Sequence, residues 1–435
     1  MSIKYDVVVV GAGAGGISCA WNAAKYGLKT LLVEKNLHCG GLITSGLVMP
    51  VMKLNHEGIN VDFYNALVKT AKDKKACITY SDGNNGWFNT ELLKSVFDDL
   101  LKSVNCDVAF LSEISNISHK NTHFSFELHS ELIGTLSQYI ETTFLVDGTG
   151  NAKIFRDLNC EILKNFGEKQ SQSLRFVMAN VDCKKFGNWI QEIDKDRDVT
   201  TVCQIDGQTH FSTAYTWDKD RNWALSPYFE AACKDNVLKP SDTAYFQIFS
   251  IPYADGAVSF NCPRLLPPEN AQDKGFLNRS ELIIEGRARI NRIAEFCKKY
   301  LKGFENAYVS NIADMLGIRE SFRICGKHIF SVEDIKSAKK PENIALASNY
   351  PIDVHSDKKD DGGMEFTNHT WYLPLESLMS KDYENLYAVG RCLSAEFKAQ
   401  AAVRTQLNCF SMGEAVAKHI NMVSNKKEPA VKQAQ

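Results

Sequence analysis

The sequence predicts an α/β fold in which a parallel-sheet domain is divided along the chain and carries an inserted, mainly antiparallel α+β domain. Three observations predict it. An unbroken apolar run at residues 7–10 leads into a glycine-rich turn, as a buried parallel strand does. Between residues 160 and 314 the strands become aromatic-rich, with longer polar connections. The first pattern then resumes, so we expect a discontinuous domain at 1–159 and 315–423, the inserted domain at 160–314, and a disordered tail at 424–435.

The composition argues against several classes of partner. The chain has 435 residues, 44% of them hydrophobic, and a net charge of −2, which predicts no basic surface for nucleic acid or an anionic membrane. Its 13 cysteines show no C-x-x-C pair and no metal-like spacing, so we expect reduced thiols and no metal. No apolar stretch reaches about 18 residues, and the first strand starts too early for a signal peptide. We therefore expect a cytoplasmic protein that acts on a small molecule, with its oligomeric state left open.

The glycine-rich turn predicts a dinucleotide site. Gly11, Gly13 and Gly16 form the pattern G-x-G-x-x-G between the strand Val7–Val10 and a helix expected over Ile17–Tyr26. The first glycine permits the tight turn, the second lets backbone approach a pyrophosphate, and the third lets the helix pack closely on the strand. Free N–H groups and the helix dipole favour phosphate at the helix N-terminus. The turn is therefore typical of a Rossmann-like domain.

Two features after this helix also fit a dinucleotide. Glu34 follows a second apolar strand, Leu28–Val33, where a carboxylate can accept hydrogen bonds from an adenosine ribose. Gly40 and Gly41 form a second loop at which backbone can approach a ligand, and Thr44 offers a hydroxyl group beside it. We expect both features to face the cofactor.

The first domain continues with alternating helix and strand patterns. Apolar residues at helical spacing predict a helix over Thr90–Val104, and a strand follows at Val108–Leu111. Two strands are expected on either side of a turn around Ile133 and Gly134. The second of them runs into Asp147–Gly150, which brings small residues to the carboxyl end of a strand. Ligands bind at that edge of open α/β sheets.

The inserted domain and the C-terminal segment provide the remaining elements. Ser280–Leu301 is expected to be one long amphipathic helix, with its arginines on a solvated face rather than at a phosphate site. Asn385–Val389 is a last apolar strand that ends in Gly390 and Arg391. A single helix is expected from about Ala401 onward. The last strand and helix return the chain to its first domain.

These motifs together resemble a known family. The segments GAGAGG, CGG, VDGTGN, GIRES, YPIDVH, GRCLSAEFKAQAAVR and MGEAVA look like those of bacterial FAD-dependent oxidoreductases distantly similar to the fumarate reductase/succinate dehydrogenase flavoprotein branch. The resemblance covers residues 5–150 and 315–420 and says little about the inserted domain. It implies an FAD-binding domain with an inserted substrate or cap domain, and FAD rather than NAD as the cofactor.

The resemblance also implies which residues hold FAD. Gly390 and Arg391 would face the pyrophosphate, and Ile114 would contact the adenine. The implied cofactor-binding residues are Gly11, Ala12, Gly13, Ala14, Gly15, Gly16, Glu34, Lys35, Gly40, Gly41, Leu42, Thr44, Ile114, Gly150, Gly390 and Arg391. Members of this family often have a histidine in the segment written here as EFKAQAA. Phe397 and Lys398 stand there instead, so no role is carried over from that histidine.

The chemistry that follows is hydride transfer between a small organic substrate and flavin N5, in a dehydrogenase, an oxidase or an ene-reductase. The catalytic candidates are Arg404, His369 and Arg319. Arg404 is expected one turn inside the helix that faces the flavin, where it could hold a substrate carboxylate or stabilise reduced flavin, with a structural ion pair as the alternative. His369 is the candidate for proton transfer. Glu320 and His355 are further candidates, with a structural ion pair and a capped loop residue as their alternatives.

Two other functions stay open at this point. In a non-redox flavoprotein, FAD would be structural or the chain would bind a partner. A monooxygenase of the geranylgeranyl-reductase or halogenase kind would share the dinucleotide turn. It should also carry a G-D-A-x-x-x-x-P segment near the C-terminal end, which GRCLSAEFKAQ does not match. The absence of a second G-x-G-x-x-G predicts no separate nicotinamide domain.

Overall fold

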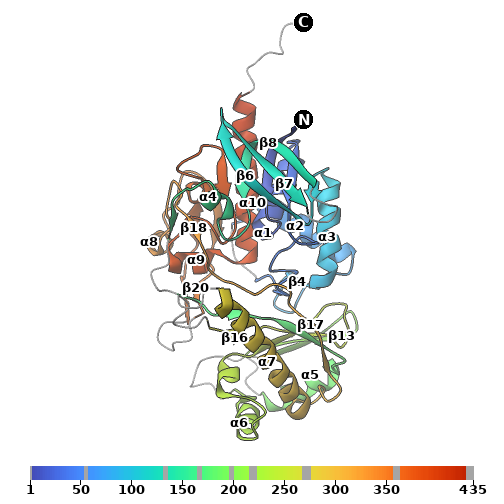
Figure 1. The fold of residues 1–435 in the computed structure, drawn as a ribbon. Helices are drawn as coiled ribbons and strands as arrows, with labels where there is room; N and C mark the ends of the chain where they lie inside the picture. Colours follow the sequence, from blue (N-terminus) through green and yellow to red (C-terminus); the bar gives the residue numbers. More distant parts are fainter. Residues whose placement is uncertain are drawn as a thin grey trace.

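The fold is built around two sheets, which lie above and below a central region in Figure 1. The computed structural model describes residues 2–52, 57–130, 136–163, 169–194, 200–214, 223–266, 276–355 and 363–427. The turn predicted around Ile133 and Gly134 and most of the predicted tail, residues 428–435, lie outside these ranges.

The first sheet has seven strands and contains the parallel core. Its order is β5-β2-β1-β8-β7-β6, and β23 pairs with β8 as well. β5, β2, β1, β8 and β23 are parallel to one another, whereas β6, β7 and β8 form an antiparallel meander. The strands are β1 (Ile3–Val10), β2 (Thr30–Val33), β5 (Asp107–Ala109), β6 (Ser112–Lys120), β7 (His123–Ser130), β8 (Leu136–Asp147) and β23 (Leu386–Ala388).

Both faces of this sheet are covered, as the unbroken apolar run of β1 predicts. Val7 and Val9 pack into one core with the helices α1 and α10, while Val8 and Val10 pack into a second core on the opposite face. The helices around this sheet are α1 (Ala14–Lys25), α2 (Asp62–Asp73), α3 (Thr90–Ser103), α4 (Lys153–Asp157), α8 (Val332–Ser337), α9 (Phe397–Val403) and α10 (Gln406–Lys427).

Helix α10 lies directly against α1. A Cβ atom on Gly413 would come within 2.2 Å of the carbonyl oxygen of Gly15, so only glycine allows this approach. Ser18 of α1 also donates a hydrogen bond of 2.6 Å to the carbonyl of Phe410. The last helix of the chain thereby fixes the helix that follows the glycine-rich turn.

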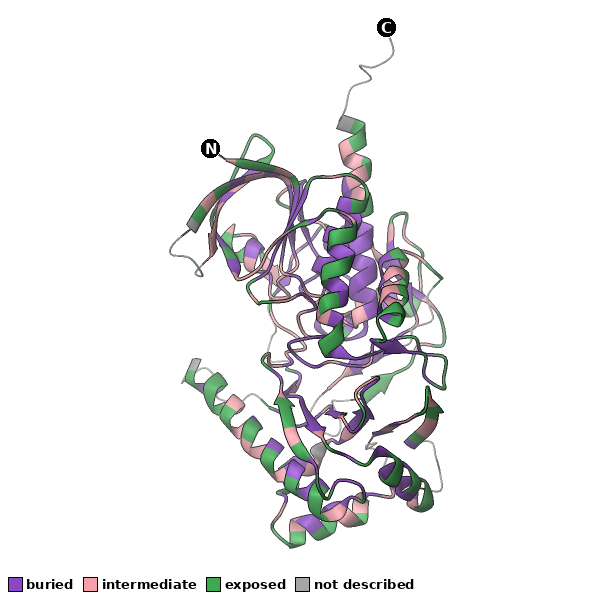
Figure 2. Cartoon of the chain, turned by 90° about the vertical axis from the view of Figure 1, so that its right-hand side faces the viewer, coloured by how far each residue is buried: buried purple, intermediate pink, exposed green. Residues whose placement is uncertain are grey.

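The second sheet has six antiparallel strands in the order β12-β13-β14-β15-β11-β17. One face packs on α5, α6 and α7 through buried aromatic residues such as Phe176, Phe260 and Phe296. Figure 2 shows α7 on the outside of this part, with exposed and buried residues along its length. The elements are β11 (Phe176–Ala179), α5 (Cys183–Ile193), β12 (Thr200–Ile205), β13 (Gln208–Ala214), α6 (Ser226–Lys234), η1 (Pro240–Ala244), β14 (Gln247–Ser250), β15 (Val258–Phe260), α7 (Phe276–Tyr300) and β17 (Tyr308–Ile312).

Five short two-stranded pairs accompany the two main sheets in the described ranges. They are β3 (Cys77–Ile78) with β4 (Trp87–Phe88), β9 (Ile162–Leu163) with β18 (Arg323–Ile324), β10 (Gln172–Ser173) with β16 (Arg264–Leu265), β19 (Ile344–Ser348) with β22 (Trp371–Pro374), and β20 (Ile352–Val354) with β21 (Gly363–Glu365). A short 3₁₀-helix, η2 (Leu375–Leu378), follows β22.

The predicted α/β class with an additional antiparallel sheet is confirmed, but three details differ. Helix α1 begins at Ala14, earlier than expected. The single helix expected from Ala401 is two helices, because the chain breaks at Arg404 and Thr405 between α9 and α10. Helix α10 continues to Lys427, so residues 424–427 are helical rather than part of a disordered tail. No helix in the described ranges is long and apolar enough to span a membrane.

Candidate active site

A cavity of ≈ 710 Å³ runs between the two sheets. Its first end lies at the carboxyl ends of parallel strands, where Val10, Val33 and Gly148 line it. Its other end is lined by side chains of the six-stranded sheet, including Gln247 and Phe249 of β14. One continuous space therefore connects the glycine-rich turn with the inserted sheet.

The three glycines of the turn have three distinct reasons to be glycine. Gly11 has φ +97°, which disfavours any side chain. A Cβ atom on Gly16 would lie 1.9 Å from the carbonyl oxygen of Gly11, so the close packing of helix on strand requires its absence. Gly13 lines the cavity, and the nearest atom to an added Cβ is 3.9 Å away. The protein therefore leaves room at Gly13, which fits the backbone approach of a pyrophosphate.

The first turn of α1 is open to the same space. Gly13 is its N-cap and provides no capping side chain, and Ala14 and Gly15 line the cavity. The unpaired amide groups of a helix N-terminus and its dipole attract phosphate. Gly15 is also held against the last strand, because a Cβ atom there would lie 2.9 Å from the amide nitrogen of Gly390.

Glu34 is buried after the end of β2, and its carboxylate joins the glycine-rich turn to Asn36. Its Oε2 accepts a hydrogen bond of 2.7 Å from the N–H of Ala12, and its Oε1 accepts from both N–H groups of Asn36. A carboxylate can accept about four hydrogen bonds, so this arrangement leaves capacity for a ribose hydroxyl. Glu34 therefore shapes the glycine turn itself, a role that the sequence did not predict.

The second loop contributes backbone rather than side-chain hydroxyls. Gly40 donates a hydrogen bond of 2.8 Å to the carbonyl of Ala12, and Gly41 comes close to Gly13. Gly40, Gly41 and Leu42 line the cavity. Thr44 does not line it and instead donates to the carbonyl of Cys39 at 2.6 Å.

The other residues implied for the cofactor fall into two groups. Those that line the cavity are Lys35, Ile114, Gly150, Gly390 and Arg391. Ala12 and Gly16 lie behind its wall. The Arg391 guanidinium donates to the carbonyls of Gly150 and Ile318, each at 2.7 Å, and so joins β8 to the segment before β18.

The start of α10 also reaches the cavity. Arg404, Thr405 and Gln406 line it. Arg404 is the C-cap of α9, directly before α10, and not one turn inside a helix as expected. The break between the helices is what brings its side chain to the wall.

The inner end of the cavity is strongly cationic. Arg175, Arg319 and Arg404 come from distant parts of the chain and all line it. Burial and the neighbouring arginines lower the pKa of Arg319 well below its ordinary value. Burial lowers the pKa of Arg175 to about 10. Guanidinium groups that line the same end of a cavity repel one another, so an anion bound among them would be stabilised.

Asp353 and His355 lie beside these arginines. Arg404 donates to the carbonyl of Asp353 at 3.0 Å, and its Nη2 lies 3.8 Å from the Asp353 carboxylate. Burial opposes the charge on Asp353, but His355 and the arginines bring its pKa below the ordinary range. His355 Nε2 lies 3.0 Å from Asp353 Oδ2, and burial followed by the charge of Arg319 lowers the pKa of His355 to about 3. The imidazole is therefore neutral at physiological pH.

Arg264 extends this group. It donates a hydrogen bond of 2.8 Å to His355 Nδ1, and its guanidinium lies 3.7 Å from the ring centre of Tyr245. Tyr245 lines the cavity. Sequence reasoning missed Arg264, Arg175 and Asp353, because no local motif shows that these segments meet.

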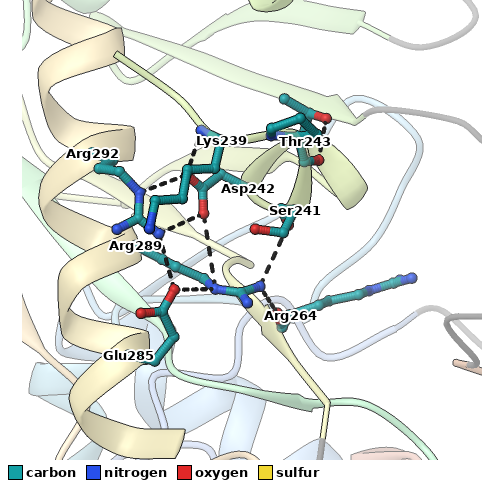
Figure 3. Close-up of polar contacts among 9 residues, drawn as sticks. Lys239, Ser241, Asp242, Thr243, Arg264, Glu285, Arg289 and Arg292 are labelled. Atoms are coloured by element: carbon teal, nitrogen blue, oxygen red, sulfur yellow. Dashed lines mark hydrogen bonds and ion pairs between the residues drawn. The ribbon is translucent and has the colours of Figure 1, made fainter. Parts of the chain in front are cut away.

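An ion-pair network outside the cavity supports Arg264 (Figure 3). Asp242, whose side chain is fully buried, accepts hydrogen bonds of 2.7 and 2.9 Å from Arg292 of α7. Arg289 of the same helix bonds Glu285 and donates to the main-chain carbonyl of Arg264 at 3.1 Å. These two arginines of α7 are thus partly buried and paired, and not on a solvated face as predicted.

His369 is not brought to the cavity. It is exposed, and its Nε2 donates to the carbonyl of Ile335 at 2.9 Å. Glu320 does not line the cavity either; its Oε1 accepts from the N–H of Gln170 at 3.0 Å, and burial raises its pKa. Of the three catalytic candidates, the structure therefore brings Arg319 and Arg404 together and leaves His369 apart.

Comparison with known proteins assigns a family to this arrangement. A family model described as "FAD dependent oxidoreductase" matches residues 6–432, nearly the whole chain. The open space at Gly13 and the uncapped start of α1 fit the pyrophosphate of such a cofactor. The relation to the fumarate reductase branch is not shown by this match.

The curated relatives are similar over part of the chain. A digeranylgeranylglycerophospholipid reductase of Thermoplasma acidophilum is 47% identical over 58 residues, which are 13% of this chain and 15% of that protein. A thiamine thiazole synthase of Sulfolobus acidocaldarius is 49% identical over 47 residues, or 11% of this chain and 18% of the relative. A solved geranylgeranyl bacteriochlorophyll reductase-like protein of T. acidophilum has 14% identity and a TM-score of 0.47, covering 99% of this chain and 81% of its own. The matched stretches thus span less than a fifth of these two curated relatives.

Proposed function

Because this chain belongs to the FAD dependent oxidoreductase family and is therefore an FAD enzyme, we propose that it transfers a hydride between a small organic anion and the flavin. The observation that carries the proposal is the meeting of Arg175, Arg319 and Arg404 at the inner end of the cavity that begins at the dinucleotide turn. Bound FAD supplies a two-electron acceptor or donor in this space.

The residues implied for FAD follow the cavity from the turn inward. Glu34, Lys35 and Ile114 would hold the adenosine part, and Gly13 with the start of α1 would hold the pyrophosphate. Gly40, Gly41 and Leu42 would lie along the ribityl and flavin part. Ala12, Gly16 and Thr44 would act indirectly, by shaping the two loops that carry the contacts.

The arginines would bind and orient the substrate. Guanidinium groups form paired hydrogen bonds with carboxylates, which fixes both the position and the direction of the bound molecule. Arg404 is held by Asp353 and Gln170, so it is already in position before an anion binds. We propose the relation to fumarate reductase flavoproteins on the sequence motifs alone.

His355 would act as a positioning residue rather than a proton donor. Both of its ring nitrogens are engaged, one with Arg264 and one with Asp353. We assign no part to His369, because it lies away from the arginines. The segment 160–314 would form the substrate domain, since β13 and β14 supply cavity walls.

A screen of the oxidised, oxygen-free protein tests the proposal. Organic acids are added one by one, and the flavin absorbance is followed; the reduced protein is screened in parallel with unsaturated acids. We expect at least one acid to bleach or restore the flavin, while its uncharged amide does so far more slowly. Bleaching by neutral compounds alone, or by none, would contradict the proposal.

A further inference from the structure

The inserted sheet presents a polar row toward the cavity, beside the arginines. Arg175 immediately precedes β11, and Asn261 immediately follows β15, its antiparallel neighbour. Asn261 also pairs with β14, because its N–H donates to the carbonyl of Gln247 at 2.8 Å. Arg175, Asn261 and Gln247 all line the cavity. The strand register therefore places a cation, an amide and a second amide side by side.

The hydrogen bonds within this row fix the direction of the amides. Gln247 Oε1 accepts from Tyr245 at 2.7 Å and from Asn261 Nδ2 at 2.6 Å. Since Nδ2 of Asn261 is the donor in this contact, its Oδ1 is the free end of the amide. Among the residues that the structure describes, this buried Oδ1 has no partner.

Two guanidinium groups that line the cavity, those of Arg175 and Arg404, also have unused donors. Arg175 donates through Nη1 to the carbonyls of Leu47 and Met49, and its buried Nε has no partner in the described part of the chain. The same holds for the buried Nε of Arg404. A buried polar group without a partner costs about 1–3 kcal/mol, so a ligand that completes all three would gain affinity.

We infer that the cavity takes a hydroxycarboxylate, whose carboxylate accepts from the unused arginine donors and whose hydroxyl group donates to Asn261 Oδ1. This inference rests on the proposed function and names its substrate class. An amine could also donate to Asn261. An amine next to a carboxylate carries a positive charge at neutral pH, however, and Arg175, Arg319 and Arg404 would repel it. The cluster thus selects a hydroxyl group over an ammonium group.

The wall beyond the row adds an apolar surface. Phe249 follows Gln247 on the same face of β14, because side chains two residues apart point to the same side. Trp87 lies edge-on to Phe249 at 5.5 Å between ring centres and is stacked on Tyr80 at 4.1 Å. All three line the cavity. Hydroxy acids with an aromatic or aliphatic substituent therefore belong in the test together with small ones.

Binding to the chemically reduced holoprotein tests the inference without turnover, since reduced flavin cannot accept a hydride. Glycolate, lactate, malate and 3-phenyllactate are titrated in a calorimeter against acetate, propionate, succinate and 3-phenylpropanoate. We expect at least one hydroxy acid to bind about tenfold tighter than its deoxy partner, the size of one satisfied buried hydrogen bond. The corresponding amino acids and hydroxy amides should bind more weakly than that hydroxy acid.

Variants assign the preference to Asn261. Asn261→Leu keeps the branched shape of the side chain and removes the acceptor, together with the donor to Gln247, so the hydroxy acid should lose its advantage while the deoxy acid binds as before. Asn311→Leu is the matched control, because Asn311 is an exposed residue of the same sheet, on β17, and does not line the cavity. If Asn261→Leu fails to fold, the ratio of hydroxy-acid to deoxy-acid affinity in the wild-type protein still tests the inference. Absence of any hydroxyl preference, or an equal preference in a folded Asn261→Leu protein, would overturn the inference.

A failure of the inferred substrate class can be told apart from a failure of the proposed hydride transfer. If hydroxy acids bind preferentially but no compound bleaches or restores the flavin, the substrate class stands and hydride transfer fails. If acids exchange electrons with the flavin but hydroxy acids have no binding advantage, hydride transfer stands and the substrate class is wrong.

Discussion

Arg264 donates a hydrogen bond of 2.8 Å to Nδ1 of His355, and this contact determines the tautomer of the neutral imidazole. Nδ1 can accept only when it carries no proton, so the proton of neutral His355 lies on Nε2, 3.0 Å from Asp353 Oδ2. Arg404 donates to the main-chain carbonyl of the same aspartate. The wall of the cavity is thereby joined to α7, because Arg289 holds the backbone of Arg264.

Acid should destabilise the protein partly through His355. Burial and Arg319 lower its pKa from 6.5 to about 3, so the unfolded chain takes up this proton first as the pH falls. Stability is then lost from about pH 6.5 toward pH 3, by at most about 1.4 kcal/mol per pH unit. His355→Gln should show a shallower loss when denaturant unfolding is measured across this range. His210 and His419, whose pKa values burial also lowers, are common to both proteins, so equal slopes would contradict the assignment.

Glu34→Gln should weaken FAD binding about tenfold or more. The variant loses charge-assisted hydrogen bonds to Ala12 and Asn36, each worth roughly 1.5–3 kcal/mol, and the turn at the pyrophosphate loosens. Glu113→Gln is the matched control, because Glu113 is exposed at the same cavity. Fluorescence titration of the apoprotein with FAD measures both. Equal dissociation constants in the two variants would show that Glu34 does not support the cofactor.

Alanine variants of two glycines in the turn should affect different properties, FAD binding in one case and folding in the other. Gly13→Ala adds a methyl group that the protein itself accommodates, so the melting temperature of the apoprotein should stay near that of the wild type while FAD affinity falls. Gly16→Ala places a carbon 1.9 Å from a carbonyl oxygen and should lower the yield of folded protein. Wild-type FAD affinity in Gly13→Ala would mean that the pyrophosphate does not lie at this glycine.

Asp242→Asn should destabilise the inserted sheet without removing FAD. The buried carboxylate neutralises Arg292 and lies 3.8 Å from Arg289, and breaking such a pair costs about 3–5 kcal/mol. Asp255→Asn, at an exposed position, is the control. Thermal unfolding followed by tryptophan fluorescence should show the loss, with flavin absorbance retained at low temperature. An unchanged melting temperature would contradict a structural role for this network.

Local sequence patterns predicted the parallel strands of the first sheet, because their apolar runs are continuous in sequence, whereas the strand β6 was not predicted. Val7–Val10 leads directly into Gly11, so strand, turn and helix can be inferred together. The same reasoning failed at Arg404. Apolar residues continue on both sides of it, so the sequence carries no local signal for the break between α9 and α10.

The substrate end of the site could not be predicted in this way. Arg264 and Asp353 lie on strands and Arg175 immediately before one, all far apart in sequence, and their contacts depend on how the two sheets meet. Histidine is a residue type suited to catalysis, yet the backbone places His369 at the surface. The chemistry of a residue therefore makes it a candidate for the site. Only the fold shows which candidates lie together.

The most direct test of the account is the rate at which an organic acid reduces the flavin in Arg404→Ala. The substrate is the acid that bleaches the wild-type protein fastest, and the reaction is followed by anaerobic stopped-flow absorbance. Arg156→Ala is the control, because Arg156 lies over the ring of Phe322 and does not line the cavity. We predict that Arg404→Ala retains FAD and reduces it about 10²-fold more slowly, the effect of losing one oriented charge, while Arg156→Ala is unchanged. Reduction at the wild-type rate in Arg404→Ala would show that the arginine cluster does not hold the substrate.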